Sequence, residues 1–468
     1  MAYTTIDKPT DYFNTILYTG NGTAIGSGGN SITGLNFQPD WVWIKNRSGT
    51  TVHHLQDAVR GSTKALYSNL TNAEGTSTEN VNSFDSDGFT VGSGTGVNTS
   101  GNNFVSWNWL AGGTAPAITY TVKVVSDSGN KYRFDDFGTS AVTLDLQEGG
   151  TYTFDQSDSS NSGHPLRFST TSNGTHGGGS EYTTGVTTTG TPGSAGAKTV
   201  ITVAASAPTL YYYCTQHSGM GGQANTNSTH GSSNFGGSIQ ANVSASTTAG
   251  FSIVSYTSNA SGQDTVGHGL GVTPNVIITK SRDGGTFNWS VFHSSVCDTT
   301  SKFLILDGTA ALSTFSTVWG ASLPTSSVFG ITSGVGVEAS DNCIAYCFAE
   351  KKGYSKFGSY TGNGNADGTF VYTGMRPAFC IIKRTDSAGY SWATYDSTRY
   401  PENKSTIPAL WSNLSDAEGS YSTVDFLSNG FKIRDTSATI NASGGTYIYM
   451  AFAENPFVTS TGIPTTAR

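Results

Sequence analysis

The chain has 468 residues, of which 12% are charged and 12% are aromatic, and its formal net charge is −8. This length predicts three or four domains, and the aromatic content excludes a disordered chain. The acidic balance and the lack of a basic stripe argue against nucleic acid as the main partner. No apolar run approaches the roughly 20 residues of a membrane-spanning helix, and the first residues carry no signal core. We therefore expect a soluble protein that folds in the cytoplasm and does not insert into membranes.

Short aromatic and β-branched runs, separated by Gly and Asn, predict an all-β chain with no long amphipathic helix. Asn-Gly, Asp-Gly and Gly-Gly pairs provide the positive-φ turns that join such strands. The spacing of the five cysteines resembles no disulfide framework, so we expect reduced thiols that pack as small hydrophobes. These cysteines are Cys214, Cys297, Cys343, Cys347 and Cys380.

An internal repeat organises most of the chain. The motif YTGNG occurs at residues 18–22 and 360–364, and a diverged copy, YTSNA, lies at 256–260. About twenty residues later each copy has a proline and a predicted strand that ends in lysine. Those strands are PDWVWIK (39–45), PNVIITK (274–280) and PAFCIIK (377–383). The segments ALYSNLTNAEG (65–75) and ALWSNLSDAEG (409–419) are nearly identical, whereas the second copy has diverged to FLILDGTAAL.

Each copy closes on a strand in which large apolar residues alternate with other residues. A period of two predicts a strand with one face in a core. The alternating residues are Val105, Trp107 and Trp109 in the first copy, Ile344, Tyr346 and Phe348 in the second, and Ile448, Met450 and Phe452 in the third. Each copy is long enough for one small sandwich, so we predict multiple antiparallel β-sandwiches.

Asp57 and Arg60 recur in the third copy as Asp396 and Arg399, and the second copy has His293 and Val296 at these positions. We interpret the two pairs as ion pairs that fix a loop rather than as catalytic groups. The adjacent histidines His53 and His54 would point to opposite faces of a strand, and we expect them on the surface or in a loop.

The repeat resembles a module of virion proteins from marine tailed bacteriophages, especially cyanophages. The resemblance rests on DAVRG, ALYSN, SFDSDGFTVG and FVSWNWLAGG in the first copy and on GFSIVSYT and VGHGLGVTPNVII in the second. It covers about three quarters of the chain and implies an exposed structural role in tail fibres or other surface appendages. It implies no catalytic residues.

A segment of different texture interrupts the repeats. The runs YTVKVV, KYRF, VTLDL and TYTFD predict short strands, and they are followed by NSGHPLRFS, which contains His164, and by APTLYYYCTQHSGMGG. Downstream, the low-complexity stretch 223–237 predicts a flexible linker or exposed loop. The next run, SIQANVSAS, fits either the last strand of this insert or the start of the second copy. His176 and His230 lie in glycine-rich loops, where we expect them to be solvated.

The insert resembles the cupredoxin fold, the Greek-key sandwich of plastocyanin and amicyanin. Amicyanin has a C-x2-H-x2-M loop, and Cys214, His217 and Met220 match it, while His164 stands at the place of the upstream histidine. The resemblance implies a type 1 copper site with these four ligands. Two departures are Pro165, which has no N–H to donate to the cysteine sulfur, and Gln216, where a proline is common. Copper as a structural clip, electron transfer and a metal-free sandwich all remain open.

We therefore expect four units: repeat one (1–115), the insert with its Gly/Ser/Asn-rich linker (116–248), repeat two (249–353) and repeat three (354–468). The main functional hypothesis is a non-enzymatic adhesin of a phage tail fibre or spike on the virion surface, made in the host cytoplasm. Its expected partners are other virion proteins and host surface glycans, and phage fibres suggest a homotrimer by analogy. Alternatives are a capsid-decorating protein and a copper-binding redox protein.

Two further expectations concern sugars. Exposed Trp and Tyr side chains are candidates for stacking on sugar rings, although most of the eight Trp are expected in the core. A glycoside hydrolase would need two carboxylates about 5–10 Å apart in a cleft. Because the acidic residues are scattered over turns, we expect that the protein is not an enzyme.

Overall fold

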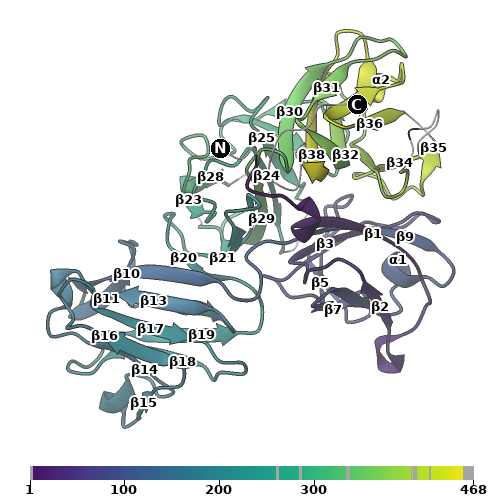
Figure 1. Ribbon diagram of the computed structural model, residues 1–468. Helices are drawn as coiled ribbons and strands as arrows, with labels where there is room; N and C mark the ends of the chain where they lie inside the picture. The colour runs from purple at the N-terminus through teal and green to yellow at the C-terminus, as the bar shows by residue number, and fades with distance from the viewer. Residues whose placement is uncertain are drawn as a thin grey trace.

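The computed structural model describes residues 4–259, 263–283, 287–333, 338–401, 403, 408–420 and 423–456. Its regular structure is almost entirely β, in mostly antiparallel sheets, which confirms the predicted fold class. The α-helices of these residues are single turns, α1 (Thr95–Asn98) and α2 (Ala438–Asn441). None of the helices in this part of the chain is long and apolar enough to cross a membrane. Figure 1 shows the insert on one side of the molecule and the three repeats gathered on the other.

Repeat one is a sandwich of a large and a small sheet. Its strands are β1 (Phe13–Thr19), β2 (Asn30–Thr33), β3 (Trp41–Asn46), β4 (His54–Asp57), β5 (Lys64–Ala65), β6 (Gly75–Thr76), β7 (Val81–Asp85), β8 (Gly88–Val91) and β9 (Asn103–Trp109), with 3-10 turns η1 (Pro9–Asp11) and η2 (Ile25–Ser27). The large sheet has the order β1-β9-β3-β4 and the small sheet β2-β8-β7, and β5 pairs with β6.

Repeat two has the same strand order in the four central strands of its large sheet, with two further strands at each edge. Its strands are β20 (Ser232–Asn234), β21 (Ala241–Ser246), β22 (Phe251–Thr257), β23 (Gln263–Gly267), β24 (Val276–Ser281), β25 (Ser290–His293), β26 (Lys302–Ile305), β27 (Ser313–Thr314), β28 (Val328–Thr332) and β29 (Asn342–Phe348). The large sheet runs β20-β21-β22-β29-β24-β25-β26-β27, and β23 pairs with β28 in the small sheet.

Repeat three follows the same plan. Its strands are β30 (Ser355–Thr361), β31 (Phe370–Tyr372), β32 (Met375–Arg384), β33 (Ala393–Asp396), β34 (Pro408–Trp411), β35 (Gly419–Ser420), β36 (Val424–Leu427), β37 (Gly430–Ile433) and β38 (Thr446–Pro456). The large sheet is β30-β38-β32-β33-β34-β35 and the small sheet β31-β37-β36. The shared strand order agrees with the repeat found in the sequence.

The insert consists of two five-stranded sheets around a core of its own. Its strands are β10 (Ala117–Ser126), β11 (Asn130–Phe134), β12 (Leu144–Gln147), β13 (Thr151–Asp155), β14 (Leu166–Ser169), β15 (Glu181–Tyr182), β16 (Val186–Thr189), β17 (Lys198–Thr202), β18 (Leu210–Cys214) and β19 (Gly222–Asn227), with 3-10 turns η3 (Ser159–Asn161) and η4 (Gly174–Gly177). One sheet has the order β11-β10-β13-β17-β16 and the other β12-β19-β18-β14-β15.

The large sheets of the three repeats face one another and enclose a single core. Aromatic contacts join the repeats: the ring centroids of Trp41 and Tyr346 are 4.3 Å apart, and Phe452 lies 5.3 Å from Phe13 and 5.8 Å from Phe348. The opposite face of each large sheet packs on the small sheet of its own repeat. The closing strands β9, β29 and β38 therefore bury both faces, and the prediction of one buried face was incomplete.

The repeats are joined head to tail into a ring. The amide of Glu74 in repeat one donates to the Arg282 carbonyl of repeat two, at 2.9 Å. The same bond runs from Leu312 of repeat two to Thr385 of repeat three, and from Glu418 of repeat three to Arg47 of repeat one, again at 2.9 Å. Each repeat thus contacts the next in the same way, and the third contact closes the cycle, as in a cyclic trimer.

The next-to-last residue of β3, β24 and β32 is a buried lysine in each repeat. Lys45 donates to the Ser415 carbonyl of repeat three, and Lys280 to the Thr71 carbonyl of repeat one. Lys383 instead donates to a carbonyl of its own repeat. Burial lowers the pKa of all three to about 8. Their ammonium groups bind backbone carbonyls rather than carboxylates.

The prediction of a flexible linker or exposed loop at 223–237 is wrong, because strands form within this segment. Residues 223–227 belong to β19 in the insert, and β20 and β21 extend the sheet of repeat two, which also places the undecided run SIQANVSAS in repeat two. His230, expected to be solvated, is buried, and its Nδ1 lies 2.5 Å from Asp40 Oδ1 in repeat one. The oxygen Asp40 Oδ2 accepts the amide hydrogens of Ala111 and Gly113. Hydrogen bonds of polar side chains thus hold this low-complexity segment against repeat one.

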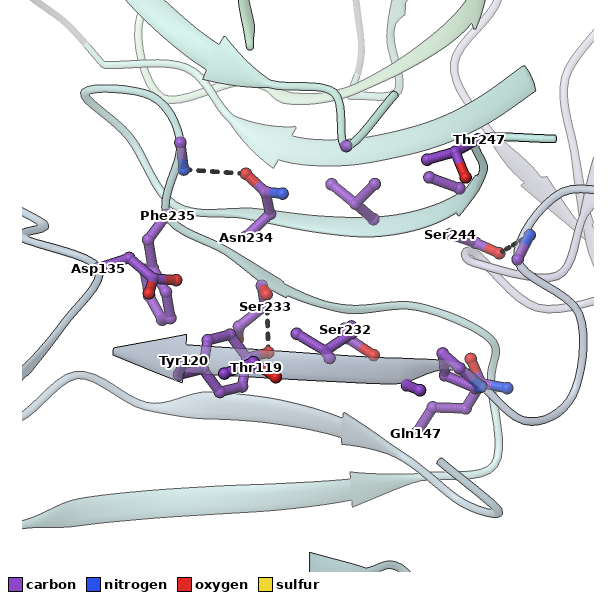
Figure 2. A pocket seen from close by; sticks show the side chains of 18 of the residues that line it. Thr119, Tyr120, Asp135, Gln147, Ser232, Ser233, Asn234, Phe235, Ser244 and Thr247 are labelled. Carbon is purple, nitrogen blue, oxygen red and sulfur yellow. Dashed lines mark hydrogen bonds between the residues drawn. The ribbon is translucent and has the colours of Figure 1, made fainter. Parts of the chain in front are cut away.

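A cavity of about 740 Å³ lies where the insert meets repeat two. Its walls come from β10, from residues 232–236 and from β21, and Figure 2 shows the side chains of Thr119, Ser233 and Ser244 around it. The Tyr120 hydroxyl donates to the Ser233 carbonyl at 2.8 Å. This bond ties the insert to the edge of the ring at one wall of the cavity.

Candidate metal centre

Two neighbouring strands of the insert bring the predicted ligands together. His164 is separated from the start of β14 by a single residue, Pro165. Cys214 is the last residue of β18. These strands are antiparallel, with Leu166 opposite Cys214, so His164 lies beside the cysteine. His217 follows three residues later in the turn that leads to β19. The sheet therefore positions one imidazole and the thiol, and the loop returns the second imidazole to them.

The distances fit one metal ion. Cys214 Sγ is 3.8 Å from His164 Nδ1 and 3.8 Å from His217 Nδ1, and the two imidazole centroids are 4.5 Å apart. With metal–sulfur and metal–nitrogen bonds of about 2.3 and 2.0 Å, a trigonal angle of about 120° separates sulfur and nitrogen by about 3.7 Å. The ligand atoms of all three residues lie within 4.8 Å of one another. A trigonal Cys-His-His ion site therefore requires little rearrangement.

Met220, the fourth predicted ligand, lies at the end of the same loop. Its side chain is buried in the core cluster that also contains Cys214, and its carbonyl accepts the amide hydrogen of Tyr132 at 3.0 Å. The structure thus brings the two imidazoles and the thiol together as a group and places the methionine in the adjoining core.

The three grouped residues differ in their contact with solvent. Cys214 is fully buried, His164 is partly buried and His217 is exposed. Burial, followed by the charge of His217, lowers the pKa of His164. The neutral imidazole, which is the form that binds metal, is therefore favoured at His164.

Several neighbours that the sequence did not single out hold the ligand loop. Asn173, in a left-handed conformation with φ of 61°, donates from its amide to Ser218 Oγ and accepts from the Gly219 amide, each at 2.8 Å. The hydroxyl of Tyr132 and the amide of Gln156 both donate to the His164 carbonyl, at 2.9 and 2.8 Å. No motif marks these residues, because their role depends on strands that are distant in sequence.

Pro165 lies between His164 and the first residue of β14. It has no N–H, so its backbone nitrogen donates no hydrogen bond to Cys214. Its carbonyl accepts from the Thr215 amide at 3.1 Å and continues the pairing of the two strands. His176 is exposed, as expected, and its Nε2 lies 3.1 Å from the Cys214 carbonyl oxygen. The histidine therefore contacts the backbone of the ligand loop and lies outside the group of ligand atoms.

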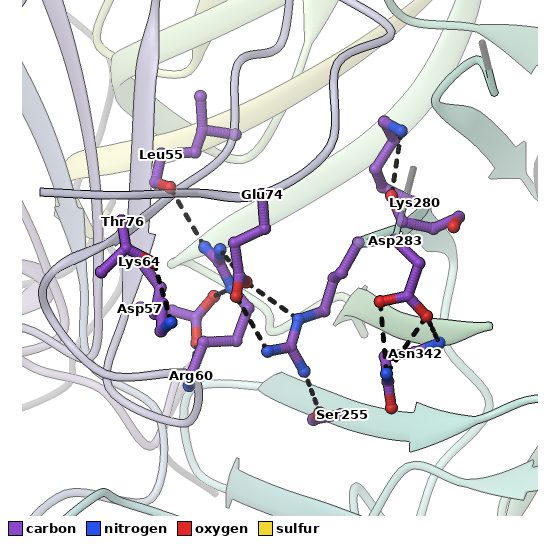
Figure 3. Close-up of polar contacts among 12 residues, drawn as sticks. Leu55, Asp57, Arg60, Lys64, Glu74, Thr76, Ser255, Lys280, Asp283 and Asn342 are labelled. Carbon is purple, nitrogen blue, oxygen red and sulfur yellow. Dashed lines mark hydrogen bonds and ion pairs between the residues drawn. The ribbon is translucent and has the colours of Figure 1, made fainter. Parts of the chain in front are cut away.

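The pairs Asp57–Arg60 and Asp396–Arg399 are fully buried ion pairs, which confirms that these residues pair as predicted. Arg60 also contacts Glu74, and Glu74 pairs with Arg282 of repeat two (Figure 3). The hydroxyl of Tyr346 in repeat two donates to Asp57 at 2.7 Å. Although burial opposes it, the two arginines lower the pKa of Glu74. A buried network of charges thus joins repeats one and two.

The same network joins repeats three and one. Arg399 contacts Glu418, which pairs with Arg47 of repeat one, and the indole of Trp107 donates to Asp396 at 3.0 Å. At the interface of repeats two and three none of these groups recurs among the described residues. The five corresponding positions hold His293, Val296, Leu312, Thr385 and Met450.

The histidines expected on the surface are in fact buried, which corrects that prediction. His54 is the first residue of β4, a strand that is buried along its whole length, and His53 immediately precedes it. The indole N–H of Trp43 donates to His53 Nδ1 at 2.8 Å, so His53 Nε2 carries the proton and donates to the Trp411 carbonyl of repeat three. Burial lowers the pKa of His53, and that of His54 to about 4.

The remaining cysteines behave as predicted. Cys297, Cys343, Cys347 and Cys380 are all buried and free. Burial raises the pKa of Cys297 to about 11 and of Cys343 to about 12. These thiols stay protonated at neutral pH and act as small core residues.

Comparison with known proteins gives one match. The sequence model of a family described as a domain of unknown function (DUF7483) matches residues 8–143 and 223–456. No curated protein and no solved structure matches the chain. The unmatched segment, 144–222, lies inside the insert and contains all four predicted metal ligands. The family model therefore covers the ring together with β10, β11 and nearly all of β19 of the insert, and the four predicted ligands lie outside the matched residues.

Proposed function

We propose that this chain, which belongs to the DUF7483 family, is a non-enzymatic protein on the surface of a bacteriophage particle. In this proposal it is an adhesin of a tail fibre or spike, attached to other virion proteins and directed at glycans of the host surface. The alternative position is the head, as a decorating fibre or knob. The protein would be made in the host cytoplasm and assembled there into the particle.

The closed ring of repeats is the observation that carries this proposal. Its three large sheets share one core, and the same backbone hydrogen bond closes each interface. The shared core buries the aromatic residues on the facing sides of the three large sheets, and this arrangement resists separation of the repeats, which suits a structural element under mechanical load. The buried carboxylates of Asp57 and Asp396 and the largely buried ones of Glu74 and Glu418 are each paired with arginine, which supports a structural role over a catalytic one.

The test of this proposal is the location of the protein. Antibodies raised against the purified chain and labelled with gold are applied to purified particles and viewed by electron microscopy. We expect label at the tail fibres or spikes, and label on the head would select the decorating role. Particles that carry neither the label nor the chain, as measured by mass spectrometry, would refute the proposal.

Metal binding by the insert is a second candidate function, because the Cys214, His164 and His217 atoms are spaced as one ion requires. Copper fits this donor set, with Met220 as a weak axial ligand. A bound ion would act as a clip between β14 and the ligand loop, or as an electron-transfer centre. Addition of Cu(II) should produce strong visible absorption that Cys214→Ser abolishes, and a colourless titration would contradict copper binding.

A further inference from the structure

Two aromatic side chains are exposed on β31 of repeat three. The exposed fraction is 44% for Phe370 and 58% for Tyr372, whereas Val371 between them is buried. Alternate residues of a strand lie on the same face, so both rings lie on the outer face of the small sheet. β31 is also an edge strand of that sheet. The rings are therefore accessible from the solvent.

The other repeats show that the fold does not require these rings. Val371 pairs with Phe431 as Ile32 pairs with Phe89 in repeat one and Val266 with Phe329 in repeat two. This register places Ser31 and Thr33 of repeat one, and Thr265 and Gly267 of repeat two, at the positions of the aromatic pair. Two repeats thus form the same small sheet with small residues at these positions, so packing alone does not account for the aromatic pair.

A row of charged groups borders the two rings. Lys432 lies opposite Phe370 on β37, and Asp425 lies opposite Lys432 on β36. Lys432 pairs with Asp367, and Arg434 contacts both carboxylates. Positively charged donors and negatively charged acceptors therefore lie next to the two rings, and their ion pairs hold them in place.

We propose that this face of repeat three, formed by Phe370, Tyr372 and the charged row, binds a sugar ring of a glycan. The C–H face of a pyranose is apolar and packs on an aromatic ring, while its hydroxyls require donors and acceptors at the rim. An aromatic side chain has about 200 Å² of surface, so about 200 Å² is exposed here, far below the roughly 800 Å² that a partner protein covers. The area fits one or two sugar rings.

This inference rests on the proposed function and makes it specific. All eight Trp side chains are buried, so the sugar-stacking residues expected among exposed Trp and Tyr are not tryptophans. Tyr372 is the most exposed large hydrophobic side chain of the described residues, and Phe370 equals Phe315 as the next most exposed. The glycan contact of the adhesin is therefore placed on repeat three.

The experiment uses saturation-transfer NMR on the full chain with a panel of free hexoses, 6-deoxyhexoses and N-acetylhexosamines at millimolar concentration. We expect transfer from the protein to the ring protons of at least one sugar. The double variant Phe370→Ser, Tyr372→Thr gives repeat three the residues that repeat one has at these positions. It should reduce that transfer at least about fivefold without changing the melting temperature. The control Phe315→Ser removes an equally exposed ring elsewhere and should leave the transfer unchanged.

Two results would overturn the inference: no sugar of the panel receives transfer, or the double variant retains it. Either result leaves the surface location intact if labelled antibodies still find the chain on particles. Conversely, the chain could bind a sugar through this face and yet be absent from particles. That result would refute the proposed function but leave the sugar-binding site supported.

Discussion

The interface between repeats one and two is built on buried charge, and the interface between repeats two and three is not, although both have the same backbone hydrogen bond. At the second interface all the charged positions differ together, and the donor Tyr346 has Met450 as its counterpart. A partial network would leave a buried charge without a partner. This lowers the free energy of unfolding far more than replacing the whole network by apolar residues does. The ring therefore does not need the charges in order to close, whereas each network must be complete or absent.

Breaking one network should have the largest effect. Arg60→Met leaves Asp57 and Glu74 buried with one partner fewer, and we expect a loss of roughly 3–5 kcal/mol in the free energy of unfolding. Chemical denaturation monitored by tryptophan fluorescence measures this loss.

The matched control converts the whole charged interface into the apolar one. Its substitutions are Asp57→His, Arg60→Val, Glu74→Leu, Arg282→Thr and Tyr346→Met. This variant should be within about 2 kcal/mol of the wild type. A converted interface that is less stable than Arg60→Met alone would show that the two interfaces are not interchangeable.

Acid should act on the apolar interface through His293. This residue is buried, its Nε2 donates to the Tyr449 carbonyl, and burial lowers its pKa to about 4. Between pH 6.5 and pH 4 the unfolded chain binds a proton that the folded chain does not, so stability falls as the pH falls through this window. The loss from this residue is at most about 3 kcal/mol. Denaturation curves for His293→Gln should depend less on pH than those of the wild type, and equal slopes would contradict the assignment.

Metal binding should separate the insert from the ring. An ion bound only by the folded insert stabilises it by about 2.7 kcal/mol at one hundred times the dissociation constant. We expect Cu(II) to raise the thermal transition of the insert and leave that of the ring unchanged. His176→Gln, which alters a neighbouring histidine outside the ligand group, should keep this shift, and His164→Ala should lose it. A shift that survives His164→Ala would place the ion elsewhere.

The smallest effect is expected from Tyr132→Phe. This substitution removes the hydrogen bond to the His164 carbonyl, while Gln156 still donates to it, so the insert should lose about 1 kcal/mol. The thermal transition of the insert measures this loss, and that of the ring should not move. An effect on the ring would mean that the two regions are energetically coupled.

The sequence predicted the strands and the repeat but not the ring. Alternation in the closing strands identified the face that bears Trp107, Tyr346 and Met450, yet period two cannot tell whether the opposite face meets solvent or a second sheet. This is why His53 and His54 were expected on the surface. Their burial depends on contacts between repeats that no local pattern contains.

The candidate site was predicted through resemblance, since His164 and Cys214 are far apart in sequence and only strand pairing brings them together. The residues around it, such as Asn173, carried no signal. The linker prediction failed because polar composition was taken for flexibility, whereas His230 is buried against Asp40. Polar residues with matched partners can be as ordered as apolar ones.

Hydrogen exchange of Arg60→Met, followed by mass spectrometry, tests the shared ring most directly. Arg60 contacts groups of repeats one and two. If the three repeats unfold as one unit around one core, the slowest amides of repeat three, in β32 and β38, should exchange faster by the same factor as those of β9 and β29. Wild-type exchange rates in repeat three, together with faster exchange in repeats one and two, would contradict the closed ring.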